Sequence, residues 1–356
     1  MSLHIDELCD PALLAAMVAG GYIRTQRHPS LPLLIYNYAE KAQYEGVWNA
    51  ATLACRGLVV DAATGLVLAR PFTKFFNHGQ PGAPELILDG PVTVTDKADG
   101  SLGVLHPVPG GWAVATRGSF DSEQARHATQ VWRTRYADRF TPPDGLTVLF
   151  EIIYPANRIV LDYGTLDDLV LLGAVDIATG RSHGPAAVPG WPGPVVETFA
   201  YGTLAEALAA PSRDDREGLV VHFTGPDTRL KIKYSEYVRL HRIVTGLNAR
   251  VVWEAVVGGT LDELLEPLPD EFHAWAAKIA AELRASVDAL AAEVESVHAE
   301  VVGGLPDGWT RKDYALAVAR HPARGCLFLR LDDKDYRALL WQQVRPSAAT
   351  SEEAVA

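Results

Sequence analysis

Hydrophobic and polar residues follow one spacing in the first two thirds of the chain and another in the last third. Between residues 31 and 234 the apolar segments are short, rich in Val, Ile and aromatic residues, and separated by Gly, Pro, Asp and Asn. This pattern predicts β-strands joined by turns. The expected strand segments are 31–39, 57–72 (two strands about a turn), 92–119 (with a hairpin turned at PVPGG), 147–155, 168–177, 218–223 and 229–234.

Two helical regions are expected before or within this strand-rich part. Residues 1 to about 30 are expected to be mainly helical, because PALLAAMVAGG is an apolar run closed by two glycines. Residues 122–140 are expected to form a helix that crosses between strands. Its apolar residues place one face toward a core: Ala125, Ala128, Val131, Trp132, Tyr136 and Phe140.

The last third of the chain has the spacing of helices throughout. The expected helical segments are 247–257, 260–268, 271–302, 310–320 and 332–344. In the longest, one buried stripe is expected from Phe272, Trp275, Ile279, Leu283, Val287, Leu290, Val294, Val297 and Val301. We therefore expect a first domain over residues 1–245, an all-helical domain over 246–346 and a disordered tail over 347–356.

The composition is that of an ordinary globular protein, with 48% hydrophobic and 21% charged residues. No apolar run reaches the roughly 18 residues of a membrane span, and no basic and then apolar leader opens the chain, so no membrane partner and a cytoplasmic location are expected. Cys9, Cys55 and Cys326 are widely spaced, which argues against a disulfide framework or a zinc site. The net charge of −12 argues against non-specific coating of nucleic acid, but allows a local basic site.

Charged residues recur at the ends of the expected strands and inside one of them. Lys97 and Asp99 lie in KADG directly after a strand, where Gly100 allows the backbone to approach a ligand closely. Glu151 lies inside an apolar strand, where an unpaired charge is costly, and Glu217 begins another strand.

Two further lysines, Lys231 and Lys233, lie two residues apart on the last expected strand, so both side chains project from one face. Taken alone, alternating lysines are typical of a soluble edge strand, and K-x-D-G is typical of a solvated turn. Together, the two acids and three lysines indicate a cleft in which cations bind phosphates and acids bind a sugar or a metal.

The motifs KADG, FE, EGLV and KIK, in this order, resemble those of the covalent nucleotidyltransferases, which are the ATP-dependent DNA ligases, RNA ligases and mRNA capping enzymes. The stretches IYNYA, CRGLVVD, RPFTKFFN, TRGSFDSEQA, YPANRIVLDY and KYSEYVRLH resemble more narrowly the family of bacteriophage T4 RNA ligase of the first type. The resemblance is strong up to about residue 245 and loose beyond it. It implies an α+β fold, with a ligase-type nucleotidyltransferase domain of antiparallel sheets followed by an all-α C-terminal domain.

The resemblance also implies an activity, that of an ATP-dependent RNA ligase using Mg²⁺ or Mn²⁺. Lys97 would attack the α-phosphate of ATP, release pyrophosphate and keep AMP on its Nζ. The AMP would pass to a 5′-phosphate RNA end, and a 3′-hydroxyl would displace it. The implied partner is RNA with such ends, for instance a broken tRNA. A separate kinase or phosphatase would heal other ends, because the chain has no GxxxxGK[ST] loop.

Matching positions in the motifs imply individual roles. Glu217 is the implied metal ligand, and Glu151 is expected to hold the ribose or help to organise the metal. Lys231 and Lys233 are expected to grip the phosphates and the leaving pyrophosphate. The other implied nucleotide-binding residues are Tyr36, Arg56, Lys74, Phe76, Asp99, Gly100 and Arg117. Phe76 is equally well interpreted as a core residue.

Other functions remain open at this level. A DNA ligase or a capping-type nucleotidyltransferase would share the motifs, but these enzymes usually have a β-barrel after the last one, and no strands for a barrel are expected. A catalytically inactive relative that binds RNA ends would keep the fold, although every motif residue is intact. Asp262 and Glu263 leave open an accessory metal site, for which a solvated helix start is the simpler interpretation.

Overall fold

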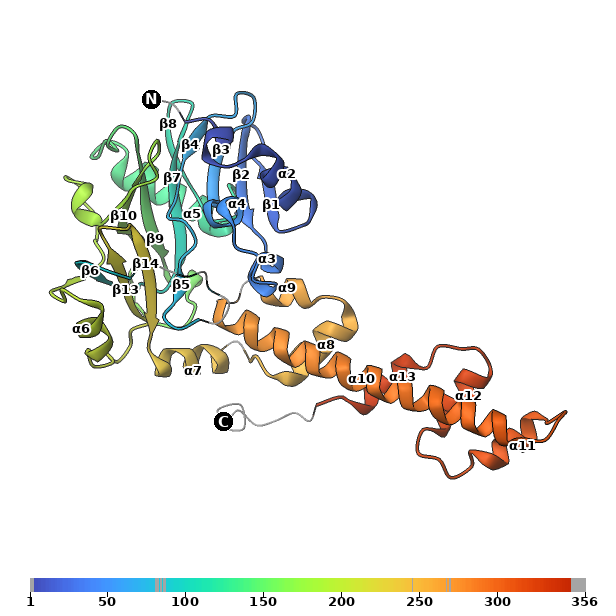
Figure 1. The fold of residues 1–356 in the computed structure, drawn as a ribbon. Coiled ribbons are helices and arrows are strands. Elements are labelled where there is room, and N and C mark those ends of the chain that lie inside the picture. Colours follow the sequence, from blue (N-terminus) through green and yellow to red (C-terminus); the bar gives the residue numbers. More distant parts are fainter. Residues whose placement is uncertain are drawn as a thin grey trace. The chain divides into compact units, whose positions relative to one another are not determined.

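The computed structural model describes residues 3–80, 83, 85, 88–244, 246–266, 268 and 270–346. The chain divides into two compact units, Met1–Val244 and Thr245–Ala356 (Figure 1). The first unit carries the sheets and the second is helical (Figure 1). The expected disordered tail, residues 347–356, lies outside the described residues.

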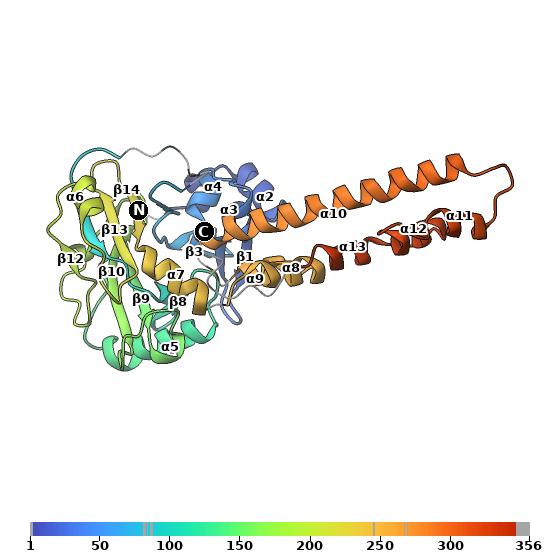
Figure 2. The same cartoon turned by 90° about the horizontal axis from the view of Figure 1, so that it is seen from below.

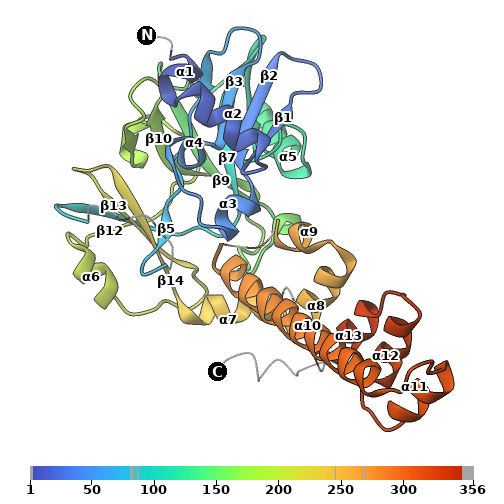
Figure 3. The same cartoon turned by 45° about the vertical axis from the view of Figure 1, so that its right-hand side comes forward.

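The strands of the first unit are β1 Ile23–Arg27, β2 Leu33–Tyr38, β3 Arg56–Asp61, β4 Val67–Ala69, β5 Phe76–Asn77, β6 Val92–Asp96, β7 Ser101–Val108, β8 Gly111–Ala115, β9 Leu146–Ile153, β10 Asp168–Asp176, β11 Ser182–His183, β12 Thr198–Phe199, β13 Gly218–Phe223 and β14 Thr228–Lys233. They form three sheets, in the orders β1-β2-β3-β4, β11-β10-β9-β7-β8 and β12-β6-β13-β14-β5. Within the described strands, every neighbouring pair except β5 and β14 is antiparallel. Figure 3 shows the third sheet set apart from the other two.

The helices of the first unit are α1 Ile5–Leu8, α2 Pro11–Ala19, α3 Glu40–Tyr44, α4 Ala50–Ala54, α5 Glu123–Val131, α6 Leu204–Ala209 and α7 Ser235–Val244, with a π-helix η1 Trp132–Tyr136 and two 3-10 turns, η2 Pro155–Asn157 and η3 Pro185–Ala187. α5 and η1 cover one face of the second sheet. The predicted apolar face of this segment is confirmed, since all six of its residues are buried. Five of the six pack in one cluster with strands β9 and β10.

The second unit consists of α8 Ala249–Gly258, α9 Leu261–Leu265, α10 Asp270–Gly304, α11 Arg311–Ala317, α12 Arg324–Leu331 and α13 Arg337–Gln343. Figure 2 shows α11, α12 and α13 running alongside the long helix α10. Much of the expected stripe on α10 is buried, with Val287 and Val294 packed against Tyr314 and Leu327. None of the helices in the described residues combines the length and the apolar character needed to cross a membrane.

The expected α+β class, with antiparallel sheets followed by helices, is confirmed. Two local expectations are wrong. Residues Ile23–Arg27, expected to be helical, form strand β1, because β2 offers a complete antiparallel partner. Helix α12 was not expected, because its sequence RGCLFLRL has a glycine and a continuous apolar run instead of a helical stripe. Burial of Cys326 and Leu327 in the cluster that contains Val287 and Val294 stabilises this helix, which is a tertiary effect.

Candidate active site

Antiparallel pairing in the third sheet brings three charged residues to one end of it. Lys97 follows β6, and its backbone N–H donates to the carbonyl of Gly218 on β13 at 3.0 Å. Gly218 pairs in turn with Lys233 on β14. Because Glu217 directly precedes Gly218, the side chains of Lys97, Glu217 and Lys233 meet.

Glu217 is buried between the two lysines. Its Oε2 lies 2.7 Å from Lys97 Nζ, and its Oε1 lies 2.8 Å from Lys233 Nζ. Burial by itself disfavours the charged form of Glu217, but Lys97 and Lys233 outweigh it and hold the pKa below its usual value. The carboxylate is therefore ionised at neutral pH, and it fixes the position of the Lys97 amine.

Glu151, the second acid of the site, has a different environment. It lies on β9 opposite Val170 of β10 and Leu102 of β7. Burial raises the pKa of its carboxyl to about 8, although Lys97 lowers it and Glu217 raises it further. Glu151 is half-buried, and the solvent that it still contacts does not offset the effect of lost hydration on its pKa. The two acids of one site thus differ in charge at neutral pH.

The KADG loop lies directly against β9, and Gly100 makes this possible. A Cβ on Gly100 would come within 2.6 Å of the Ile152 carbonyl oxygen and 3.1 Å of Glu151 Cγ. Any side chain would push the loop away from the strand that carries Glu151. Close packing against β9 therefore explains why a glycine is needed at position 100. The expected contact of Gly100 with the nucleotide stays a prediction.

Asp99 turns inward from the same loop, and its carboxylate is engaged by the protein itself. Its Oδ2 accepts hydrogen bonds from the backbone N–H groups of Val160 and Leu161 at 3.0 and 2.9 Å, and its Oδ1 accepts from Tyr237 Oη at 2.7 Å. Only 5% of Asp99 is exposed. These hydrogen bonds hold the backbone of Val160 and Leu161 and the side chain of Tyr237 against the KADG loop. The motif did not reveal this structural role of Asp99. The expected contact of Asp99 with the nucleotide stays a prediction.

Asp99→Ala is expected to lower the free energy of unfolding by about 3 kcal/mol or more, because two buried backbone N–H groups lose their acceptor. Tyr237→Phe removes one donor and is expected to cost about 1 kcal/mol. Urea unfolding of both variants measures the difference. Equal losses in the two variants would show that Asp99 does not organise the loop through the backbone of Val160 and Leu161.

Lys74 is buried among aromatic rings, with 4% of its surface exposed. Its Nζ lies 4.9 Å from the ring centroid of Phe76, 5.3 Å from that of Trp48 and 5.5 Å from that of Tyr38. Trp48 stands edge-on to the other two rings. The ring faces stabilise the cation in a place where water cannot. Phe76 therefore packs on Lys74, and Trp48, which lies outside every recognised motif, completes the cage.

Tyr36 does not join this group. It packs against the cluster that contains Cys55, and burial, followed by Cys55, raises its pKa. The pairing register of β2 and β3 shifts directly after Tyr36, where β3 carries one extra residue, so this bulge alters β3 and leaves the alternation along β2 intact. Tyr38 instead accepts a hydrogen bond from Arg117 Nη1 at 3.1 Å. The structure thus places Tyr38, rather than Tyr36, beside Arg117 and Lys74, and a nucleotide contact by Tyr36 stays a prediction.

Arg56 and Lys231 approach one ring, that of Phe75. The guanidinium carbon of Arg56 is 5.2 Å from the ring centroid, and Lys231 Nζ is 5.4 Å from it. Arg56 also lowers the pKa of Glu151, which places its charge near that acid. Sequence reasoning missed Phe75, although it belongs to the RPFTKFFN stretch, because local sequence does not reveal which cations surround a ring.

The carboxylate of Glu217 and, after loss of its proton, that of Glu151 are the groups in this site suited to a hard divalent cation. Mg²⁺ is usually held by one or two carboxylates together with water and substrate phosphates, so this pair fits such an ion. The described residues contain no cluster of three or more His, Cys, Asp or Glu side chains that could hold a metal. Asp262 and Glu263 lie in the first turn of α9.

Comparison with known proteins gives a family match to part of this chain. Residues 54–201 match a family model described as RNA ligase. A Thermovibrio ammonificans protein, named an RNA ligase by inference, is 34% identical over 134 residues, which is 35% of this chain and 34% of that protein. The RNA ligase of Rhodothermus phage RM378 is 22% identical over 380 residues, covering 84% of this chain and 85% of the phage protein.

Among solved structures, a mutant of the Naegleria gruberi RNA ligase with ATP and Mn is 19% identical, with a TM-score of 0.33; the match covers 43% of this chain and 52% of that one. This chain thus spans about a third of the Thermovibrio relative and about half of the Naegleria protein. The resemblance to RNA ligases found in the motifs is confirmed by the family match over residues 54–201.

Proposed function

We propose, since residues 54–201 match the RNA ligase family, that the protein is an ATP-dependent RNA ligase joining 5′-phosphate and 3′-hydroxyl RNA ends. The observation that carries the proposal is the amine of Lys97, held by Glu217 at 2.7 Å among further cations. Such an arrangement suits attack on a phosphate, because the surrounding positive charges neutralise the phosphate oxygens and the leaving group.

In the first step, Lys97 Nζ attacks the α-phosphorus of ATP. A nitrogen–phosphorus bond forms as the bond to the bridging oxygen breaks, and pyrophosphate leaves. Lys97 must lose a proton to attack. Lys231 and Lys233 are positioned on one strand to receive the departing phosphates. A Mg²⁺ or Mn²⁺ ion held by Glu217, with Glu151 beside it, would supply further charge neutralisation.

In the later steps, an oxygen of the RNA 5′-phosphate attacks the same phosphorus and releases Lys97. The 3′-hydroxyl of the second end then attacks the RNA 5′-phosphorus, and AMP leaves. We include the repair of broken tRNA in the proposal, with a separate enzyme preparing ends that lack the right chemistry, because the chain has no P-loop sequence for a kinase of its own.

Incubation with α-labelled ATP and Mg²⁺, followed by a denaturing gel, tests the proposal. Label retained on the protein is expected, and label transferred to RNA with a 5′-phosphate should follow. Sealing of matched RNA and DNA ends then distinguishes an RNA ligase from a DNA ligase. A protein that binds RNA but never takes up label would support the inactive end-binding alternative.

A pH dependence of stability is expected from Glu151. Its carboxyl has a pKa of about 8 in the folded protein, against an ordinary value near 4.3 in an unfolded chain. The folded state therefore binds more protons than the unfolded state between these values, so the free energy of unfolding falls as pH rises through this window. Relative to Glu151→Gln, the wild type is expected to lose at most about 5 kcal/mol between pH 4.5 and pH 8.

Urea unfolding of the wild type and Glu151→Gln at a series of pH values measures this dependence. The glutamine variant is the matched control, because it keeps the shape and loses the titrating proton. Parallel pH curves for the two proteins would contradict the assignment of a neutral carboxyl to Glu151.

A further inference from the structure

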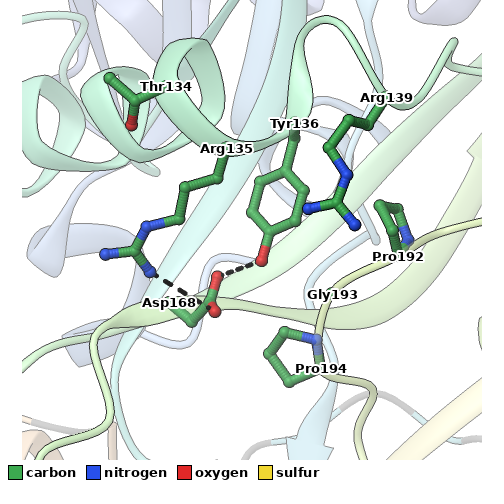
Figure 4. Close-up of a pocket in the computed structure, with 8 residues that line it drawn as sticks. All are labelled: Thr134, Arg135, Tyr136, Arg139, Asp168, Pro192, Gly193 and Pro194. Carbon is green, nitrogen blue, oxygen red and sulfur yellow. Dashed lines mark hydrogen bonds and ion pairs between the residues drawn. The ribbon is translucent and has the colours of Figure 1, made fainter.

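A second pocket lies in the first unit and shares no lining residue with the Lys97 site. It has a volume of about 490 Å³, within the roughly 300–1,000 Å³ of ordinary ligand sites. Its walls come from the π-helix η1 with the turn after it, the start of β10 and the loop after η3 (Figure 4). The lining residues are Thr134, Arg135, Tyr136, Arg139, Asp168, Pro192, Gly193 and Pro194.

The base of the pocket is formed by the buried side chain of Tyr136, which is held by several contacts. Tyr136 is buried against Trp191, with 4.3 Å between ring centroids, and its hydroxyl donates to Asp168 Oδ1 at 2.5 Å. A Cβ on Gly193 would lie 2.6 Å from the Tyr136 hydroxyl oxygen, so the loop reaches the tyrosine only because this residue is glycine. A π-helix is rare and is often found at functional sites.

The two arginines differ in what holds them. Arg135 donates to the Asp167 carbonyl and lies 3.5 Å from Asp168 Oδ2, so its guanidinium is fixed. Arg139 is exposed, and through its side chain it makes no hydrogen bond or ion pair with any residue that the structure describes. Figure 4 shows the two guanidinium groups on opposite sides of the Tyr136 ring. The pocket thus presents two arginine side chains. That of Arg135 is held by Asp167 and Asp168, and that of Arg139 is exposed.

Strand register relates this pocket to the candidate active site. Val170 on β10 pairs with Glu151, and Asp168, two residues earlier on β10, pairs with Ile153. Two residues of strand span about 7 Å. Asp168 therefore lies at the same end of the second sheet as Glu151. Tyr136 and η1 pack on the face of Phe150 and Ile152. Glu151 belongs to the other face, so an RNA strand that reaches both sites passes around this end of the sheet.

We propose that this pocket binds one nucleotide unit of the RNA strand beyond the end that is joined. Its phosphate lies between Arg139 and Arg135, and its sugar lies against Pro192 and Pro194. Arginine suits this role because its fork of N–H donors matches phosphate oxygens. The Asp168 carboxylate does not repel the phosphate strongly, since Tyr136 and Arg135 already engage it. This inference rests on the proposed RNA ligase function for its choice of ligand.

The test compares Arg139→Ala with Arg133→Ala in the full-length protein. Arg133 is also exposed and lies on η1, but it does not line the pocket. Binding of a fluorescent 5′-phosphorylated RNA 12-mer is measured by anisotropy at several salt concentrations without ATP. Arg139→Ala is expected to bind about tenfold more weakly at ~0.1 M salt, with a salt slope smaller by about one. Arg133→Ala should stay within about twofold of the wild type, and Arg139→Lys should lie between.

Labelling with α-labelled ATP in the same preparations separates this inference from the proposed function. Arg139→Ala is expected to form the AMP adduct at the wild-type rate, because the pocket lies outside the Lys97 site. Equal RNA binding by Arg139→Ala and the wild type, or equal weakening by Arg133→Ala, would overturn the pocket assignment while leaving the ligase proposal intact. If the wild type takes up no AMP but RNA binding still depends on Arg139, the ligase proposal fails and the pocket stands.

Discussion

Lys97→Ala is expected to abolish the covalent AMP adduct, reducing retained label to background. Glu217 contacts the amines of both Lys97 and Lys233, and the amine of Lys97 is the proposed nucleophile. Alanine has no amine and cannot form a nitrogen–phosphorus bond. Lys97→Arg is expected to fail equally, because a guanidinium stays protonated and is a poor nucleophile. Denaturing gels after incubation with α-labelled ATP and Mg²⁺ measure the adduct.

Lys278→Ala is a suitable control for the loss of a lysine, because Lys278 is exposed on α10 of the second unit. It should label as the wild type does. Urea unfolding should show that Lys97→Ala still folds, so that lost label reports chemistry. Wild-type labelling of Lys97→Ala would remove the nucleophile assignment and, with it, the mechanism proposed for the first step.

Glu217→Gln is expected to have the second largest effect, lowering both the rate of adduct formation and the stability. The amide keeps the shape of the carboxylate but cannot neutralise Lys97 and Lys233, which lie half-buried beside it. Removing one partner of a buried ion pair costs about 3–5 kcal/mol. Because Glu217 also fixes the position of the Lys97 amine, the rate is expected to fall by about 100-fold or more.

A double variant separates the two effects. Glu217→Gln combined with Lys233→Met removes one unneutralised cation, so it should recover part of the lost stability without recovering the rate. Urea unfolding and labelling at saturating Mg²⁺ give both quantities. If the double variant regained wild-type labelling, Glu217 would matter only for folding, and its role toward a metal and toward Lys97 would be refuted.

The sequence by itself predicted most of the local elements and the candidate site residues. The strand segments from residue 31 to residue 234 and the long helix α10 follow from short-range periodicity, which depends on how each segment buries one face. The apolar face of residues 122–140 was predicted for the same reason. Glu151 stands out locally, because a charge inside an apolar strand is costly without a partner, and Lys97 and Glu217 stand out through the ordered motifs.

Only the tertiary structure decided how those residues meet. The order β6-β13-β14 brings Lys97, Glu217 and Lys233 together, and strand order is set by long-range pairing that no local pattern contains. Tyr36 packs in a core cluster with Ile5 and Leu14, which come from distant parts of the sequence and reach it only in the folded chain. The inward turn of Asp99 depends on donors from segments that reach it only in the folded chain.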